Sequence, residues 1–118
     1  MMLRNSTSTI SGAATGDVTG DWFYVGNMTK ATIMATASDA GTSGSVKIQV
    51  SNEASPGGPQ MPYTPTIYLE LASPSVSVSG TTVGIASPFD LAYQWARLKF
   101  TRVAGTTGTV TALFAAHD

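Results

Sequence analysis

The stretch Ser45-Val46-Lys47-Ile48-Gln49-Val50-Ser51 decides the fold class, because its apolar and polar residues alternate without a break. The three aliphatic residues fall on one face of an extended chain and the polar residues on the other. This two-residue period is that of a β-strand with one buried face. Such strands are typical of antiparallel sheets that cover a core on one side only.

The same alternation recurs along the chain and marks the remaining strands. Strand patterns cover residues 22–25, 28–37, 67–71, 76–78, 82–86, 92–103 and 109–116. Turns rich in Gly or Pro separate them, and no segment has a convincing helical period. About eight short strands with such turns predict an all-β fold, an antiparallel β-sandwich of jelly-roll-like form.

The chain of 118 residues is short enough for one domain with one core. Residues 1–20 are mostly Ser, Thr, Gly and Ala, which predicts a flexible N-terminal arm that can supply one edge strand. Residues 21–118 then form the single sandwich domain. Residues 52–65 carry several prolines and predict a long loop. The arm and residues 54–65 of this loop are candidates for contacts between subunits.

The composition narrows the function classes. Charged residues make up 11% of the chain and the net charge is −1, so the sequence has no basic patch of the kind that binds nucleic acid. A surface so poor in charge suggests that part of it is buried in an assembly. There is no Cys, and we expect neither a signal peptide nor a membrane-spanning segment.

Two stretches of seven residues are nearly identical. Residues 40–46 read Ala-Gly-Thr-Ser-Gly-Ser-Val and residues 104–110 read Ala-Gly-Thr-Thr-Gly-Thr-Val. No Lys follows their second glycine, so they are not phosphate-binding loops of the Walker type. We expect two β-hairpin tips of similar geometry, each leading into a core strand through Val46 or Val110. If both lie at the same end, they are candidates for docking to a partner.

The residues that carry catalytic chemistry are sparse. The single histidine, His117, lies next to the C-terminus, and the acidic residues are scattered. Asp17 and Asp21 can touch a Ca²⁺ ion, although their setting among glycines favours a role in turns. Glu53, Glu70 and Asp90 carry no mark of a paired acid site. We therefore predict no enzyme, no catalytic or metal-binding residue and no cofactor.

Four aromatic residues and one arginine give the candidate contacts, namely Trp22, Tyr63, Tyr93, Trp95 and Arg97. In an ideal strand one face carries an aromatic and cationic stripe made of Tyr93, Trp95, Arg97 and Lys99. We favour packing and protein interfaces for these residues, with Arg97 stacked over Trp95. A flat platform for sugar binding, which Tyr24 and Tyr68 can also join, stays as the alternative.

Three segments together resemble a known class of proteins. These are Gly44–Glu53, with its pattern ending in Gln-Val-Ser-Asn-Glu, Tyr93–Thr101, which contains Tyr-Gln-Trp-Ala-Arg-Leu, and Gly105–Thr111. Their order is similar to that of small β-sandwich virion proteins of bacteriophages, of the head-decoration, minor capsid or tail-associated kind. The resemblance covers roughly residues 30–116 and brings no catalytic residue with it.

The resemblance implies a structural virion protein made in the cytoplasm of a host bacterium. Its expected role is that of a capsid decoration, cement or minor capsid subunit that self-associates and stabilises the shell without catalysis. Its expected partners are copies of itself, with a trimer favoured on lattice grounds, and the major capsid protein or other virion proteins. The alternative is a tail-associated or carbohydrate-binding module that contacts host glycans.

Overall fold

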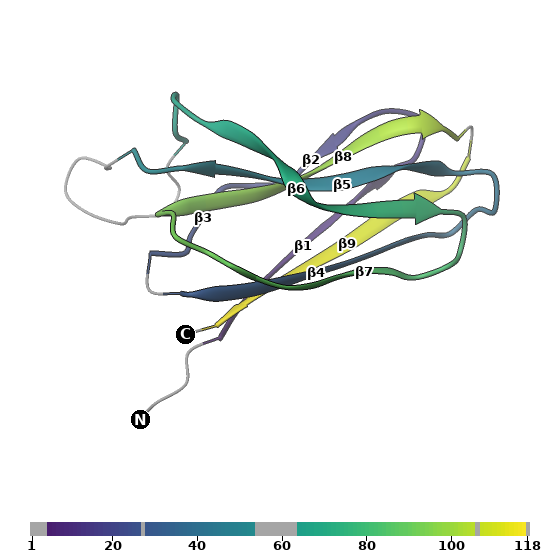
Figure 1. Ribbon diagram of the computed structural model, residues 1–118. Helices are drawn as coiled ribbons and strands as arrows, with labels where there is room; N and C mark the ends of the chain where they lie inside the picture. The colour runs from purple at the N-terminus through teal and green to yellow at the C-terminus, as the bar shows by residue number, and fades with distance from the viewer. Residues whose placement is uncertain (1–4, 27, 54–63, 106, 118) are drawn as a thin grey trace.

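The computed structural model describes residues 5–26, 28–53, 64–105 and 107–117, whose strands form two antiparallel sheets packed face to face (Figure 1). Nine strands lie in these residues. They are β1 (Asn5–Ala13), β2 (Val18–Thr19), β3 (Phe23–Tyr24), β4 (Lys30–Ala37), β5 (Ser43–Ser51), β6 (Leu69–Ser79), β7 (Gly84–Asp90), β8 (Trp95–Ala104) and β9 (Thr109–His117).

The strand order is that of a jelly roll. The first sheet has the order β1-β9-β4-β7, and the second has the order β2-β8-β5-β6, with β3 paired to β8 as well. The chain crosses between the sheets after β1, β3, β4, β6, β7 and β8. These crossings give the two Greek keys of a jelly roll. The predicted all-β, jelly-roll-like sandwich is therefore confirmed. The patterns at 67–71 and 76–78 join in β6, and β1 and β2 bring the number of strands in the described residues to nine.

The core lies between the inward faces of the two sheets, as the alternation predicts. Val46, Ile48 and Val50 are all buried, and so are the alternate residues of β4, β8 and β9. Phe114 of β9 lies at the centre of an aromatic group, with its ring centroid 5.0 Å from that of Phe23. The aliphatic residues of the strand that decides the fold class thus form part of the core.

Much of the predicted N-terminal arm belongs to the sandwich. Residues 5–13 form β1, which pairs with β9 from Asn5 opposite His117 to Ala13 opposite Thr109, without a register shift. Val18 and Thr19 pair with β8 in the second sheet. β1 is thus the edge strand that residues 1–20 were expected to supply.

Two prolines that predict a strand break and a turn lie inside strands. β6 continues through Pro74, which follows a cis peptide bond, and β7 continues through Pro88. Both strands lie at the same edge of the sandwich, where a missing backbone N–H leaves no ladder bond unmade. The register of each strand against its neighbour also shifts, between Lys47 and Gln49 for β6 and between Ala31 and Ile33 for β7.

The two similar stretches are not hairpin tips, and this prediction was wrong. The first joins β4 of the first sheet to β5 of the second, and the second joins β8 of the second sheet to β9 of the first. Their local patterns could not show this, since a crossover between packed sheets and a hairpin use loops of similar length. Val46 and Val110 do enter the core, as predicted.

The two stretches also differ in backbone conformation. Gly105 has a φ of 151° and Gly108 a φ of 83°, whereas neither Gly41 nor Gly44, at the equivalent places in the first stretch, has a positive φ. Gly44 is required for a different reason, because a Cβ there would lie 2.3 Å from the carbonyl oxygen of Thr101. Nearly the same sequence thus serves two different turns.

Both crossovers lie at the same end of the sandwich, on the right in Figure 1, and bond to each other. Ser38 N–H donates to the Thr109 carbonyl oxygen at 2.9 Å, Thr109 N–H donates to Ser38 Oγ at 2.8 Å, and the Thr107 hydroxyl donates to Asp39. The Thr107 hydroxyl and then the Gly41 N–H lower the pKa of Asp39 below its usual value of 3.8. Polar groups of the two crossover loops are therefore hydrogen-bonded to each other at this end of the sandwich.

Candidate functional site

The outer face of the second sheet carries a cluster around Arg97, which we call the Arg97 cluster. The guanidinium carbon of Arg97 lies 4.5 Å from the ring centroid of Trp22 and 4.9 Å from that of Tyr68. The two rings meet edge to face, with centroids 5.6 Å apart. Arg97 therefore stacks on Trp22 and Tyr68, and the predicted stacking over Trp95 was wrong.

Polar residues of adjacent strands complete the Arg97 cluster. Gln49 of β5 lies opposite Arg97 on one side and opposite Glu70 of β6 on the other. Arg97 Nε donates to Gln49 Oε1 at 2.6 Å, and Gln49 Nε2 donates to Glu70 Oε1 at 3.3 Å. This ladder holds the guanidinium in place and explains why Gln49 is buried on an outward face.

Trp22 and Trp95 are both removed from solvent. Trp95 is 0% exposed and Trp22 is 5% exposed. The Trp95 ring meets Tyr24 edge to face at 5.4 Å, and its Nε1 donates to the Glu53 carbonyl oxygen at 3.0 Å. In this conformation both indoles are packed within the protein.

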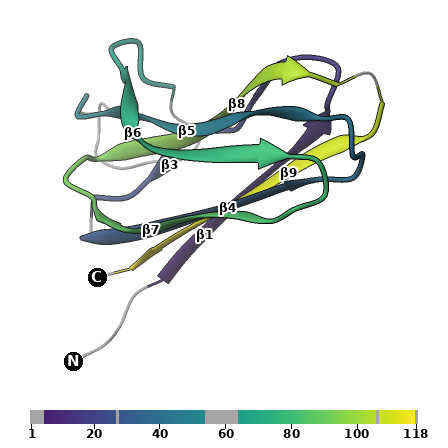
Figure 2. The same cartoon turned by 45° about the vertical axis from the view of Figure 1, so that its right-hand side comes forward.

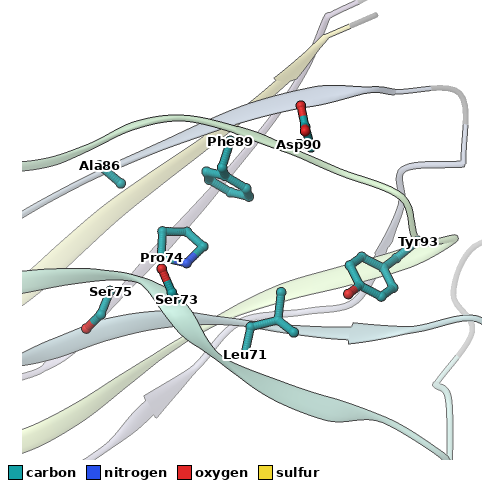
Figure 3. Close-up of a pocket in the computed structure, with 8 residues that line it drawn as sticks. All are labelled: Leu71, Ser73, Pro74, Ser75, Ala86, Phe89, Asp90 and Tyr93. Carbon is teal, nitrogen blue, oxygen red and sulfur yellow. The ribbon is translucent and has the colours of Figure 1, made fainter.

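Tyr93 lies apart from Trp95, in a hollow at the sandwich edge formed by β6 and β7. Figure 3 shows the rings of Tyr93, Phe89 and Pro74 around this space, together with Leu71. The hollow measures about 570 Å³, and serine side chains of β6 and the Asp90 carboxylate lie at its rim. Since β8 begins only at Trp95, the expected stripe of Tyr93, Trp95 and Arg97 does not form.

The remaining residues considered in the sequence either bond to the backbone of neighbouring segments or fall outside the described residues. Tyr63 lies outside them. Asp17 Oδ1 accepts a hydrogen bond from Arg102 N–H at 2.9 Å, which fits the favoured role in a turn. Glu53 accepts bonds from the backbone N–H groups of Thr66 and Ile67 at 2.9 and 2.8 Å. Within the described part of the chain, no three His, Asp or Glu side chains are grouped as a metal site.

The outer face of the first sheet carries a row of apolar side chains that the sequence analysis did not single out. Met34 of β4 lies opposite Ile85 of β7 and opposite Leu113 of β9, so the row crosses three adjacent strands. Ile85 is 67% exposed and Met34 is 39% exposed. Together with Val83, Met34 and Leu113 also line a shallow apolar depression. We call these four residues the apolar row.

The surroundings of the apolar row are neutral. Thr36 and Thr111 flank it, and the nearest charged side chains on β4 and β7, Lys30 and Asp90, pair with each other at the far end of these strands. The signal for this surface was present in the sequence, because Met34 alternates with the buried residues of β4. A single outward methionine, however, does not show that the adjacent strands place apolar residues beside it.

Comparisons with known proteins bear on the fold. No protein-family model and no curated protein matches the chain. Among solved structures, the SPBc2 prophage-derived protein YomS is similar over 100% of this chain and 96% of its own, with a TM-score of 0.55 and 20% sequence identity. At that identity the likeness shows the shared fold alone.

Two further solved structures are similar at lower scores. The carbohydrate-binding module CBM36, in complex with calcium and xylotriose, is matched over 100% of both chains, with a TM-score of 0.42 and 12% identity. A structure of infectious bursal disease virus, Gx strain, is matched over 97% of this chain and 32% of that chain, with a TM-score of 0.45 and 12% identity. In the described residues, no helix has the length and apolar character needed to span a membrane.

Proposed function

We propose that this chain is a structural subunit of a bacteriophage virion, a capsid decoration or minor capsid protein that acts by binding alone. The observation that carries the proposal is the apolar row beside and across the first sheet, in which Met34, Val83 and Ile85 are exposed and Leu113 is half-buried. Contiguous apolar surface on a folded domain is typical of a protein–protein contact. A face of this kind fits a flat, neutral protein surface such as the shell of a capsid.

The chemistry of this face suits docking without an enzyme-like site. Its threonine and aliphatic side chains lose little hydration free energy on burial, because no charged group must leave water. Lys30 and Asp90 form an exposed ion pair at the end of the face and can stay solvated at the rim. Binding would therefore depend on apolar area and shape rather than on a few strong polar contacts.

The size of the face indicates how many contacts it needs. The first sheet has four strands, and β4 has eight residues. With about 4.8 Å between strands and about 3.3 Å per residue, its face covers on the order of 500 Å². A stable pairwise interface buries about 800 Å² per partner. One face alone gives a weak contact, which becomes stable when several copies bind together, as in a shell.

The phage origin in this proposal rests on two other observations. The segments Gly44–Glu53 and Tyr93–Thr101 resemble strands of small phage virion proteins. The protein YomS, which shares the fold over 96% of its length, is prophage-derived. Jelly rolls occur in viral capsid and lectin domains, so the fold agrees with the proposal, by analogy only.

The direct test is to purify phage particles from the bacterial strain that encodes this chain and to quantify its peptides by mass spectrometry. We expect the chain in a fixed ratio to the major capsid protein after protease and salt washes. Particles that lack the chain should lose their DNA at lower temperature than complete particles. Absence of the chain from washed particles would contradict the proposal.

A second candidate function, carbohydrate binding, is favoured by the hollow around Tyr93. Its aromatic rings, serine hydroxyls and the Asp90 carboxylate are the groups that bind sugars, by stacking and by hydrogen bonds. A glycan array with the native chain and Tyr93→Ala would test it, with Tyr68→Ala as a control outside the hollow. Binding that Tyr93→Ala removes and Tyr68→Ala keeps supports a tail-associated, glycan-contacting module.

A further inference from the structure

Two of the four edge strands carry features that prevent pairing with another chain. β6 contains Glu70 and Pro74, and β7 contains Pro88 and Asp90. The registers of both strands against their neighbours also shift. Charges, prolines and bulges on edge strands are the known means by which proteins avoid edge-to-edge association.

The free side of β8 in the second sheet is covered in another way. β2 pairs with β8 over only two residues, Val18 and Thr19, and β3 pairs with two more. Between them Gly20 N–H donates to the Leu98 carbonyl oxygen at 2.9 Å, and beyond them Asp17 accepts from Arg102 N–H. Short strands and a carboxylate therefore occupy this edge.

The fourth edge strand, β1, has none of these features. Residues 5–13 read Asn-Ser-Thr-Ser-Thr-Ile-Ser-Gly-Ala, without a charge or a proline. β1 pairs with β9 over nine residues in one continuous register, and it is the last strand of the first sheet (Figure 2). No strand among the described residues pairs with its other side. Its outward N–H and C=O groups therefore form an open template for a further strand.

We propose that this edge pairs with β1 of a second copy of the chain, antiparallel and about a two-fold axis. This inference deepens the proposed function, on whose self-association it rests. Identical strands pair antiparallel by symmetry, and β1 brings no charge that would lie opposite a like charge. The net charge of −1 adds little repulsion between whole copies.

The pairing has a geometric consequence for the docking face. A two-fold axis that relates antiparallel strands of one sheet is perpendicular to that sheet, so the outer faces of both copies lie on the same side. The two four-stranded sheets then form one eight-stranded sheet that carries the apolar row twice. Its face covers on the order of 1,000 Å², above the size that a stable interface needs on each partner.

A cysteine scan of β1 tests the inference, because the native chain has no Cys. Nine single variants at residues 5–13 are oxidised at a fixed protein concentration, and disulfide-linked dimers are measured. A residue on the axis faces its own copy at a distance that a disulfide spans. We expect one position to dominate. In a mixture of two other variants, the two cysteines should cross-link when the sum of their residue numbers equals twice the number of the dominant residue.

Ser77→Cys and Ser79→Cys, both exposed in β6, are the controls on a protected edge. A second test places a charge on each edge, with Thr7→Lys in β1 and Ser77→Lys in β6. Thr7 lies opposite Ala115, which is on the outer face of the first sheet, so the charge does not enter the core. We expect Thr7→Lys to raise the dissociation constant of the dimer at least tenfold in sedimentation equilibrium, with an unchanged melting temperature. Ser77→Lys should leave the dissociation constant unchanged.

Three results would overturn the inference. They are a monomer at millimolar concentration, cross-linking at Ser77 or Ser79 as efficient as in β1, and a scan of β1 without a dominant position. The virion proposal has its own readout, the presence of the chain in washed particles. A chain that is found in particles but does not pair through β1 keeps the virion role and loses this interface.

Discussion

The two similar seven-residue stretches provide a sharp test of the structure, because glycines at equivalent places have different roles. Gly41 and Gly105 both follow an alanine and precede a threonine. A Cβ at Gly41 would have only Asp39 Oδ1 nearby, at 3.4 Å, which is ordinary contact. A Cβ at Gly105 would lie 2.7 Å from the carbonyl oxygen of Ala14, on a backbone with a φ of 151°.

We expect Gly105→Ala to be destabilising and Gly41→Ala to be neutral or slightly stabilising. An alanine forced into a conformation suited to glycine costs about 1–3 kcal/mol, and relieving the contact with a backbone oxygen costs about 1–3 kcal/mol more. The free energy of unfolding should therefore fall by about 2–6 kcal/mol in Gly105→Ala. In Gly41→Ala it should rise by up to about 1 kcal/mol, because alanine restricts the unfolded chain.

Urea denaturation followed by tryptophan fluorescence measures both variants. Trp22 and Trp95 are buried in the native state, so their emission should shift to longer wavelength on unfolding. A fall of 2 kcal/mol moves the urea midpoint by about 1–2 M for slopes of about 1–2 kcal/mol per M. Equal effects of the two substitutions would refute the assignment of different turns to the two stretches. A stable Gly105→Ala would refute the close approach of Ala14.

Three further predictions concern the surface. Arg97→Ala should lower the free energy of unfolding by about 1–3 kcal/mol in urea denaturation, because two ring contacts and the hydrogen bond to Gln49 are lost. The control is Lys99→Ala on the same face of β8, which should lower the free energy of unfolding by less than about 0.5 kcal/mol. The lowered pKa of Asp39 stabilises the fold above pH 3.8, and this contribution is lost as the pH falls through the lowered value. Thermal melts between pH 2 and 6 should therefore show a steeper acid loss for the native chain than for Asp39→Asn. Ile85→Ser should reduce the number of copies retained on washed particles at least fivefold, while Val103→Ser, which changes a side chain that is 75% exposed elsewhere, should retain the native number.

The sequence predicts the core well because the two-residue period survives in every long strand of the interior. Val46, Ile48 and Val50 are a buried set that alternation alone identifies. Alternation does not identify Trp95, which lies on the outward face of its strand and is nevertheless fully buried. It is covered by Tyr24 and by the chain at Glu53, two segments distant in sequence that only the folded structure brings together.

The prolines inside strands and the crossover loops also could not be predicted from local sequence. Pro74 and Pro88 predict breaks for a central strand, and whether a strand is central or at an edge is a property of the whole topology. The crossovers after β4 and β8 have the loop composition of hairpins. Nothing local records that the next strand enters the other sheet, so these features could not be assigned before the strand order was known.

The distribution of unprotected surface connects the fold to the proposed role. The crossover end of the sandwich is closed by bonds among its own loops, with Gly80 N–H donating to the Thr42 carbonyl oxygen at 2.7 Å and Ala14 N–H to that of Gly108 at 3.1 Å. The Arg97 cluster covers part of the outer face of the second sheet. The apolar row and the edge of β1 lack such protection, and both belong to the first sheet. A subunit that pairs through one edge and docks through the adjoining face needs both features on one sheet, because only then does each added copy extend the same docking surface.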